Sequence, residues 1–192
     1  MYHNRNNQME LLGLFRGDYK KQIYLRMISK LSDIPLKTTQ DTLSFLEKER
    51  IIKSKVEGRN KYFGLNTDNI ITKQYLLQTE CYFTNKFLEK YPNFKTFLKE
   101  INTNTTLIIF GSFARFMTSK DSDVDLLTIS KNKIQLPSHL LANKLHIVNL
   151  SEESFSKAID QGEPLIKEII ENHIILNNHS FFINTLWGYY GK

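Results

Sequence analysis

The sequence predicts an α+β fold in which a basic N-terminal part and a neutral C-terminal part are joined by a helical segment. Residues 1–66 contain apolar groups at helical spacing, followed by two β-prone runs around a turn. In residues 67–101, aromatic and leucine side chains recur at helical intervals. Residues 102–192 alternate buried-strand patterns with helical ones. We therefore expect a small N-terminal domain, a helical linker and a mixed β-sheet with flanking helices.

The net positive charge of the chain comes entirely from its first third. Of the 26 basic and 20 acidic residues, residues 1–66 hold thirteen basic and seven acidic, a net charge of +6. Residues 67–192 hold thirteen of each and are neutral. This division suggests that the first part meets a polyanion and that the second part does something else.

The cysteine content and the length of the apolar runs predict the cellular compartment of the protein. Cys81 is the single cysteine, so an internal disulfide framework is excluded and a reducing, cytoplasmic compartment is expected. No apolar run reaches the roughly eighteen residues that span a bilayer, so no membrane partner is expected.

The N-terminal part has a recognisable order of elements. The patterns predict a helix over 7–15, a short strand over 22–24, a helix over 25–35 and another helix beginning at Leu36. Two β-prone runs between 51 and 66 flank the turn signal Glu57-Gly58-Arg59-Asn60. This order over residues 7–66 resembles a winged helix-turn-helix domain, in particular that of archaeal transcription regulators.

The resemblance implies binding to double-stranded DNA. Its second helix would present polar side chains to the major groove while basic groups and the hairpin hold the phosphates. Asp41 opposes phosphate contact, although it can accept a hydrogen bond from cytosine. The alternative use of such a domain is as a protein interface or dimerisation unit. The candidate DNA-binding residues are Lys37, Thr38, Gln40, Ser44, Lys53, Lys55, Arg59 and Lys61.

The helical segment over 67–101 carries a wide apolar stripe, interrupted at Pro92. Such a stripe must be covered. A second copy of the chain would cover it in a homodimer, and packing on the C-terminal domain would cover it equally well. The sequence leaves both arrangements open.

The stretch 106–115, "TLIIFGSFAR", predicts a buried strand that ends at Gly111 and leads into a helix. Free backbone N–H groups at such a strand-to-helix turn suit a phosphate. Gly111 allows close approach of the backbone because it has no Cβ. The sequence therefore suggests a phosphate site at Gly111 and Ser112.

Two aspartates open the next predicted strand, over 123–130. Because side chains alternate along a strand, Asp123 and Asp125 point the same way. Neighbouring carboxylates repel unless a cation lies between them, and oxygen-only ligation suits Mg²⁺ or Mn²⁺. An ordinary loop capped by the aspartates would explain neither this pairing nor the Gly-Ser strand exit.

The combination Gly-Ser-x-Ala-Arg, a short loop and Ser-Asp-x-Asp-Leu resembles the signature of minimal nucleotidyltransferases of the polymerase-beta-like superfamily. The resemblance implies that Asp123 and Asp125 are catalytic metal ligands and that Gly111 and Ser112 bind the triphosphate. Arg115 and Ser122 are weaker candidates for nucleotide contacts. The implied reaction transfers a nucleoside monophosphate to a hydroxyl, with pyrophosphate leaving.

The sequence departs from that signature at two places. Active members of the family usually supply a third carboxylate from a following strand, but the strand predicted over 144–150 contains no acid. His146 occupies the usual carboxylate place and can accept a proton or ligate a metal. Glu152 and Glu153 instead read as first-turn acids of a helix. Phe116 stands where the family often has glycine.

The rest of the C-terminal part completes the predicted domain. Helices are expected over 151–160 and 163–172, a strand over 173–176, and an aromatic-rich helix or tail at the end of the chain. Trp187, Tyr189 and Tyr190 are expected to pack on the middle helices or on a dimer partner rather than to bind a ligand.

Two functions from different classes remain open on the sequence alone. The first is a Mg²⁺- or Mn²⁺-dependent nucleotidyltransferase that takes a nucleoside triphosphate and carries a DNA-binding module. Its acceptor hydroxyl would belong to a small molecule or to a partner protein, and the resemblance to antitoxins of this family implies the partner protein as one option. The second is a non-catalytic transcription regulator whose C-terminal domain senses a nucleotide. The intact aspartate pair favours the enzyme, and the missing third carboxylate favours the regulator.

Overall fold

The computed structural model describes residues 5–101, 104–132 and 134–191. The chain divides into two compact units, one of Met1–Thr79 with Leu186–Lys192 and one of Glu80–Thr185. The boundary that the sequence predicted at residue 102 lies outside the described residues. Within the described part of the chain, every helix is too short or too polar to cross a membrane.

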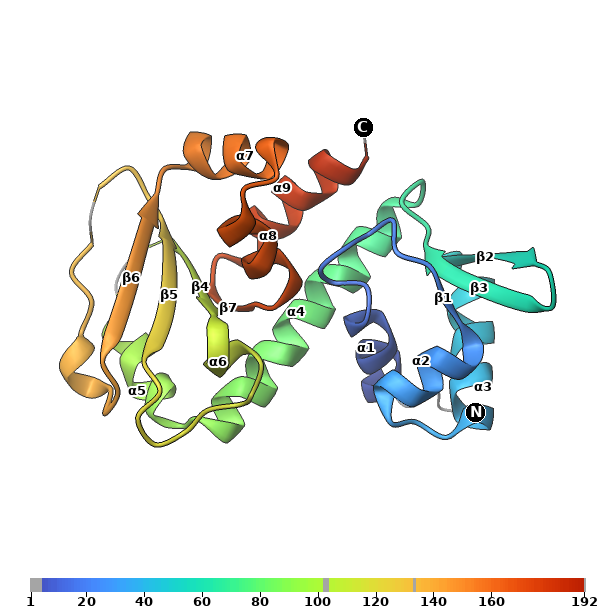
Figure 1. The fold of residues 1–192 in the computed structure, drawn as a ribbon, viewed down its shortest axis with the longest axis horizontal. Coiled ribbons are helices and arrows are strands. Elements are labelled where there is room, and N and C mark those ends of the chain that lie inside the picture. The colour runs from blue at the N-terminus through green and yellow to red at the C-terminus, as the bar shows by residue number, and fades with distance from the viewer. Residues whose placement is uncertain (1–4, 102–103, 133, 192) are drawn as a thin grey trace. The chain divides into compact units, whose positions relative to one another are not determined.

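The first unit contains the helices and strands expected for residues 7–66 (Figure 1). Its three strands form one antiparallel sheet in the order β1-β3-β2, and β2 and β3 are a hairpin closed by Gly58 at φ +60°. A positive φ at a hairpin turn suits glycine, which has no Cβ to clash. The elements are α1 (Arg5–Gly13), β1 (Ile23–Tyr24), α2 (Leu25–Ser32), α3 (Leu36–Lys48), β2 (Ile52–Glu57) and β3 (Asn60–Leu65).

The core of this unit forms where the three helices meet. Leu12, Ile28, Leu43 and Leu46 are fully or almost fully buried. Leu36, on the same helical stripe as Leu43 and Leu46, is 44% exposed because it lies in the first turn of α3, beyond that core. The buried stripe of α3 is thus shorter than its sequence pattern.

The aromatic end of the chain belongs to this first unit. The rings of Trp187 and Tyr190, near the end of α9 (His179–Tyr190), lie 6.4 and 4.9 Å from the ring of Tyr19. The Tyr190 hydroxyl also donates a hydrogen bond to the carbonyl of Gly17. These residues therefore pack against the loop that follows α1.

The second unit is built on a four-stranded sheet in the order β6-β5-β4-β7. The pair β5·β6 is parallel, whereas β4 is antiparallel to both of its neighbours. The elements are the second half of α4 (Ile70–Lys90), α5 (Asn93–Lys99), β4 (Thr106–Phe110), α6 (Gly111–Ala114), β5 (Val124–Ile129), the short 3₁₀ helix η1 (Ser138–Leu140), β6 (Leu145–Leu150), α7 (Glu152–Gln161), α8 (Pro164–Glu171), β7 (Ile174–Asn177) and the first half of α9.

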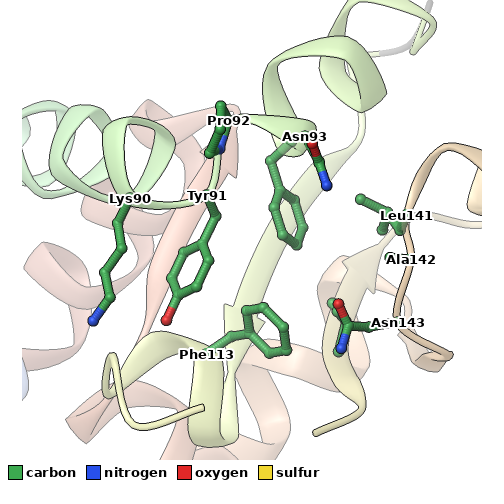
Figure 2. A pocket seen from close by; sticks show the side chains of 10 residues that line it. Lys90, Tyr91, Pro92, Asn93, Phe113, Leu141, Ala142 and Asn143 are labelled. Atoms are coloured by element: carbon green, nitrogen blue, oxygen red, sulfur yellow. The ribbon is translucent and has the colours of Figure 1, made fainter. Parts of the chain in front are cut away.

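Both faces of this sheet are covered. On one face, Leu107 of β4 and Leu126 of β5 join a cluster with Phe87 and Phe97 from α4 and α5. Figure 2 shows Tyr91 and Phe113 close together at one end of this cluster. Ile108 and Leu127, which alternate with the first set, are also fully buried, and α7, α8 and α9 carry further buried side chains such as Phe155, Ile169 and Phe182.

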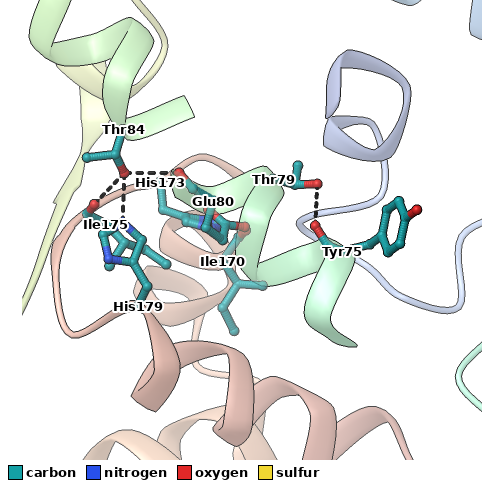
Figure 3. Close-up of polar contacts among 8 residues, drawn as sticks. All are labelled: Tyr75, Thr79, Glu80, Thr84, Ile170, His173, Ile175 and His179. Carbon is teal, nitrogen blue, oxygen red and sulfur yellow. Dashed lines mark hydrogen bonds and ion pairs between the residues drawn. The ribbon is translucent and has the colours of Figure 1, made fainter. Parts of the chain in front are cut away.

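A set of buried polar side chains joins α4 to β7 and to the residues on either side of β7 (Figure 3). Glu80 Oε2 lies 3.2 Å from His173 Nε2, and each of these side chains is 1% exposed. Thr84 Oγ1 donates to the carbonyl of Ile175 in β7 at 2.6 Å and lies 2.9 Å from His179 Nε2. Because buried polar groups are costly unless paired, these contacts fix how α4 lies against β7.

Candidate active site

Gly111 is required at its position for two independent reasons. Its φ is +67°, a conformation that residues with a Cβ rarely adopt. A Cβ added there would also lie 2.3 Å from Oδ2 of Asp125, where no atom fits. The turn after β4 therefore lies directly against the Asp125 carboxylate, and only glycine permits both the bend and the contact.

The two aspartates differ in environment. Asp125 is the second residue of β5, pairs in register with Phe110 of β4, and has a side chain that is 30% exposed. Asp123 lies one residue before β5, is exposed, and makes no hydrogen bond or ion pair with any residue that the structure describes. The strand pairing begins at Val124, whose N–H donates to Lys144 O at 2.8 Å. Both carboxylates thus stand at one end of the sheet, open to solvent.

His146 of β6 stands directly beside Asp125. The two residues are register partners in the parallel pair β5·β6, and His146 Nδ1 lies 3.2 Å from Asp125 Oδ1. An ionised carboxylate only accepts hydrogen bonds, so a neutral imidazole in this contact carries its proton on Nδ1. The lone pair of Nε2 is then available to a ligand. The His146 side chain is 65% exposed, which leaves that nitrogen accessible.

The weaker nucleotide-contact candidates are engaged within the protein. Arg115, just after α6, forms an ion pair with Glu168 of α8. Ser122 Oγ accepts a hydrogen bond from the N–H of Ser119 at 2.8 Å, which closes the loop before the aspartates. Asn143 Nδ2 donates to the carbonyl of Ser122 at 2.9 Å and holds that loop to the segment before β6. Ser112 is half-buried beside Gly111.

Phe116 occupies a backbone conformation that glycine adopts without strain. Its φ is +58°, in the left-handed region. Its ring is 6.3 Å from the rings of both Phe87 and Tyr91, so packing of the side chain offsets the backbone cost. A glycine at this position would relieve the strain and lose the packing.

The donor set fits a hard divalent cation held partly by substrate. Among the described residues there is no group of three or more histidine, cysteine, aspartate or glutamate side chains placed to hold a metal. Two carboxylates with open positions nevertheless match the way Mg²⁺ is bound beside substrate phosphates, with water filling the remainder. Asp125 Oδ2 faces the space left by the missing Gly111 Cβ. The residues present therefore suit a divalent cation, which Asp123 and Asp125 would hold and which would supply positive charge to substrate phosphate oxygens.

The DNA-binding candidates all lie in the first unit, and most of their cations are paired. The four lysines of the set form ion pairs with N···O distances between 2.6 and 3.2 Å. These pairs are Lys37–Asp41, Lys53–Asp68, Lys55–Glu57 and Lys61–Glu47. Arg59, at the hairpin turn, is exposed and has no acidic partner in the described part of the chain.

The polar candidates of α3 lie on its outer side. Gln40 and Ser44 are exposed, and Thr38 is half-buried. The Ser44 hydroxyl donates a hydrogen bond to the backbone carbonyl of Gln40 at 2.8 Å. Gln40 and Ser44 share one side of the helix because they are four residues apart, whereas Thr38, two residues before Gln40, lies on another side. They are therefore open to a partner of the first unit.

Several residues at the site carry no signal in the sequence. Glu168 is one of the two exposed acids of α8, and nothing in its spacing relates it to Arg115. Asn143 lies in an irregular segment where no periodicity applies. Long-range contacts of this kind depend on topology, which local patterns do not contain.

Comparison with known proteins gives a family match for one part of the chain. No curated protein and no solved structure gives a significant match. Residues 92–177, from the start of α5 to the end of β7, match the family model described as a nucleotidyltransferase domain. The matched segment contains Gly111, both aspartates and His146 and leaves out the first unit. By this match, the second unit is similar to nucleotidyltransferase domains, which supports nucleotidyl transfer as its general function, a nucleoside triphosphate as its substrate and a divalent metal as its usual requirement.

Proposed function

We propose that the chain transfers a nucleoside monophosphate from a nucleoside triphosphate to a hydroxyl group, with Mg²⁺ or Mn²⁺ bound at Asp123 and Asp125. One observation carries the proposal. The missing Cβ of Gly111 brings the strand-to-helix turn into contact with Asp125. A phosphate on the turn and a cation on the carboxylates would therefore be neighbours, as the transfer reaction requires.

The roles of the residues follow from their chemistry. Gly111 and Ser112 offer a backbone that phosphate oxygens can approach closely, and Asp123 and Asp125 offer hard oxygen ligands. A divalent cation held there supplies positive charge to the phosphate oxygens and to the attacking oxygen. Arg115 can contact phosphate once it leaves Glu168, an exchange of one anion for another.

His146 takes the position that a third carboxylate would fill, and we assign it the role of proton acceptor. The acceptor hydroxyl oxygen bonds to the α-phosphorus, and the bond from that phosphorus to the β-phosphate oxygen breaks. Pyrophosphate leaves with the electron pair, and the hydroxyl proton passes to Nε2 of His146. Asp125, in contact with Nδ1, stabilises the imidazolium that results.

The first unit is proposed to be a winged helix-turn-helix domain that binds double-stranded DNA and confers transcription regulation in the cytoplasm. The support is the order α1-β1-α2-α3-β2-β3, the net positive charge of residues 1–66, and the exposed polar side of α3. Residues 67–101 are proposed as a linker that also mediates a homodimer. A partner protein is proposed as the hydroxyl acceptor.

A second candidate function is a regulator that binds a nucleotide without transferring it. The observation in its favour is that β6 offers a histidine instead of an acid beside Asp125. Loss of a negative charge weakens the hold on a second cation, on which in-line displacement commonly depends. This candidate shares the triphosphate site with the enzyme and differs only in turnover.

Calorimetric titration of the full chain with ATP, CTP, GTP and UTP tests the shared site. Titrations are run with and without Mg²⁺ or Mn²⁺, on the wild type, on Asp123→Ala, and on Asp121→Ala as a control that removes an exposed carboxylate from the same loop. We expect metal-dependent binding that Asp123→Ala abolishes and Asp121→Ala preserves. Absence of binding at millimolar concentrations of every triphosphate would exclude both candidates.

Turnover separates the two candidates. The chain is incubated with α-³²P-labelled nucleotide and a lysate of cells that contain the acceptor, and label is followed on protein and on small molecules. The enzyme predicts label that depends on Asp123 and on His146. The regulator predicts tight nucleotide binding with no label transferred.

DNA binding is tested by fluorescence anisotropy of duplex DNA over a series of salt concentrations. Each lost phosphate contact reduces the slope of log K against log salt by about one. We therefore expect Arg59→Ala to weaken binding and flatten the slope, whereas Lys157→Ala, in the second unit, leaves both unchanged. Equal slopes for the three proteins would remove Arg59 from the interface.

A further inference from the structure

An ion pair in the second unit joins the candidate phosphate turn to α8. Arg115 Nη2 contacts Glu168 Oε1, and the two side chains are 42% and 47% exposed. Arg115 directly follows α6, and its N–H donates a hydrogen bond to the carbonyl of Gly111 at 3.2 Å. The backbone that carries the guanidinium is therefore tied to the turn at which a phosphate is proposed to bind.

The pair lies at the end of the sheet where the aspartates stand. Phe110, the last residue of β4, pairs with Asp125 near the start of β5. Ile109 pairs with Ile174, the first residue of β7, and α8 ends at Glu171, just before that strand. The segment that runs from α8 into β7 therefore reaches the sheet beside the turn and the carboxylates.

The pair also lies on the aspartate face of the sheet. Val124 and Leu126 belong to the cluster that α4 and α5 cover, and Asp125, between them in β5, points to the opposite face. The buried isoleucines of α8 lie outside that cluster of described residues. α8 therefore packs on the opposite face, and Arg115 meets Glu168 on the side of the sheet that carries Asp125.

Glu168 stands where an anionic ligand of Arg115 would stand. A guanidinium binds carboxylate and phosphate oxygens through the same N–H donors. Within the described part of the chain, no three acidic, histidine or cysteine side chains are grouped to hold a metal, so the contact of Glu168 is with the guanidinium rather than with a shared cation site. A phosphate oxygen that binds Nη2 of Arg115 therefore replaces the carboxylate oxygen of Glu168.

The competition between carboxylate and phosphate is intramolecular on one side. Ile166 and Ile169 of α8 are 1% and 0% exposed, so the helix that carries Glu168 is anchored in the core. A carboxylate held on a fixed helix faces the guanidinium at a constant effective concentration. Every phosphate ligand that uses Arg115 must overcome this standing contact, which lowers its apparent affinity.

We propose that Glu168 is an internal competitor of the triphosphate for Arg115 and thereby sets the affinity of the candidate site for phosphate ligands. The guanidinium passes from Glu168 to a phosphate when the triphosphate binds, and it returns to Glu168 when the phosphates leave. The inference rests on the proposed function, because it takes the turn at Gly111 and the two aspartates as the triphosphate site. Glu168 acts through Arg115 and touches no reacting atom.

A double-mutant cycle tests the competition. Calorimetry measures the affinity of the full chain for the Mg²⁺ complexes of ATP, CTP, GTP, UTP and inorganic tripolyphosphate. The proteins are the wild type, Glu168→Gln, Arg115→Gln and the variant with both changes. Glu171→Gln is the control, because it removes the same charge from the other exposed acid of α8. Glutamine has nearly the shape of glutamate, and both positions are exposed, so the fold should persist.

The expected result is that Glu168→Gln binds triphosphates and tripolyphosphate about three- to fivefold more tightly than the wild type. Partly exposed ion pairs shift an equilibrium by factors of about this size. Arg115→Gln should bind about tenfold more weakly, because a charge-assisted contact is lost. Glu168→Gln should have no further effect when Arg115 is already replaced, and Glu171→Gln should match the wild type.

Other results overturn the inference and leave the proposed function standing, provided that binding still depends on Asp123. Equal affinities of the wild type and Glu168→Gln would show that the carboxylate does not compete. The same gain in affinity with and without Arg115 would show that Glu168 acts as a repelling charge and not through the guanidinium. A loss of affinity in Glu168→Gln would show that the carboxylate positions Arg115 for the ligand, which is the opposite role.

Failure of the proposed function has a different signature. Triphosphate binding that Asp123→Ala leaves unchanged would place the phosphates outside the candidate site, and the inference would fall with the site. Absence of binding to both the wild type and Glu168→Gln would exclude the two together.

Discussion

Two histidine–carboxylate pairs in the second unit have the same separation and opposite surroundings. His173 and Glu80 lie 3.2 Å apart with both side chains 1% exposed, and His146 and Asp125 lie 3.2 Å apart with side chains 65% and 30% exposed. Burial gives the first pair a structural role, because removing either partner leaves a buried polar atom of the other without this contact. Exposure leaves the second pair free to exchange its partners for a ligand.

The two pairs show that the same residue types at the same distance can have different roles, depending on how far they are buried. The buried pair links α4 to the segment before β7, and the exposed pair links the starts of two parallel strands at the open end of the sheet. We therefore expect substitutions in the first pair to change stability and substitutions in the second to change ligand binding. The following predictions test that division.

The largest effect is expected from Glu80→Ala. Breaking a buried pair by removing one partner costs about 3–5 kcal/mol, because here Nε2 of His173 stays buried without its contact to Glu80. Urea denaturation followed by circular dichroism measures the loss. Glu89→Ala, an exposed acid on the same helix, should change stability by less than about 0.5 kcal/mol. A loss below about 1 kcal/mol for Glu80→Ala would contradict the structural role of the pair.

Gly111→Ala should disturb the exposed pair without removing a charge. The matched control is Gly162→Ala, since Gly162 has φ +65° and nothing within 4 Å of an added Cβ. The control carries only the backbone strain, about 1–2 kcal/mol. Gly111→Ala adds a clash with Asp125 Oδ2, which we expect to cost a further ~1–3 kcal/mol.

Metal binding is the second measurement on the same two variants. Mn²⁺ binding, followed by electron paramagnetic resonance, should disappear in Gly111→Ala because Asp125 is displaced, and it should persist in Gly162→Ala. If the two variants match in both stability and Mn²⁺ affinity, the close approach of Gly111 to Asp125 has no role.

His146→Asp should increase the affinity of the exposed site for a divalent cation. An added carboxylate beside Asp125 favours a divalent cation, and we expect Mg²⁺ affinity to rise about tenfold, measured by competition with Mn²⁺. His139→Asp makes the same charge change at an exposed residue of η1 and should have little effect. His139→Asp should change stability by less than about 0.5 kcal/mol. His146→Asp loses the contact with Asp125 and sets two carboxylates side by side, so without a cation it should be less stable by up to about 1 kcal/mol. Equal Mg²⁺ affinities in the two variants would place His146 outside the site.

The smallest expected change in stability comes from Glu47, a carboxylate that is paired with a lysine, Lys61, instead of a histidine. Burial alone would raise the pKa of Glu47, but hydrogen bonds from Lys61 and Ser54 lower it below its ordinary 4.5. The contribution of Glu47 to stability is therefore fully present above pH 4.5 and is lost as the pH falls through the lowered pKa.

Glu47→Gln tests this dependence. Because the pair is partly exposed, we expect the wild type to be more stable by less than about 1 kcal/mol at pH 7. Melting temperatures of the two proteins should converge toward pH 3. A difference that persists unchanged at low pH would show that the Glu47 contacts do not depend on its charge.

Much of the local structure was predictable because it depends on local chemistry. The run at 106–110 is apolar after Thr106, and every residue of β4 is buried. The strand over 144–150 shows two faces in its alternation, and the structure pairs His146 of that strand in register with Asp125. The hairpin turn at Gly58 and the N-cap at Ser151 likewise follow from residue types.

What the sequence did not predict depends on contacts between distant segments. The pairing of Arg115 with Glu168 and the packing of Trp187 on Tyr19 join residues far apart in the chain. The pocket of about 200 Å³ in the second unit is lined by residues from four separate segments, so no single sequence motif describes it. Phe116 illustrates a further limit, because an aromatic residue at φ +58° contradicts its own backbone preference and is held by its neighbours.

The antiparallel pairing of β4 with β5 also bears on how the site assembles during folding. The turn at Gly111 and the carboxylate of Asp125 come together as soon as this hairpin closes, through contacts that are short in sequence. His146 arrives later, since the parallel pairing of β6 with β5 requires the intervening segment to cross over. In a nascent or partly unfolded chain, the contact between the turn and its carboxylate can therefore exist before the residue assigned to accept the proton is in place.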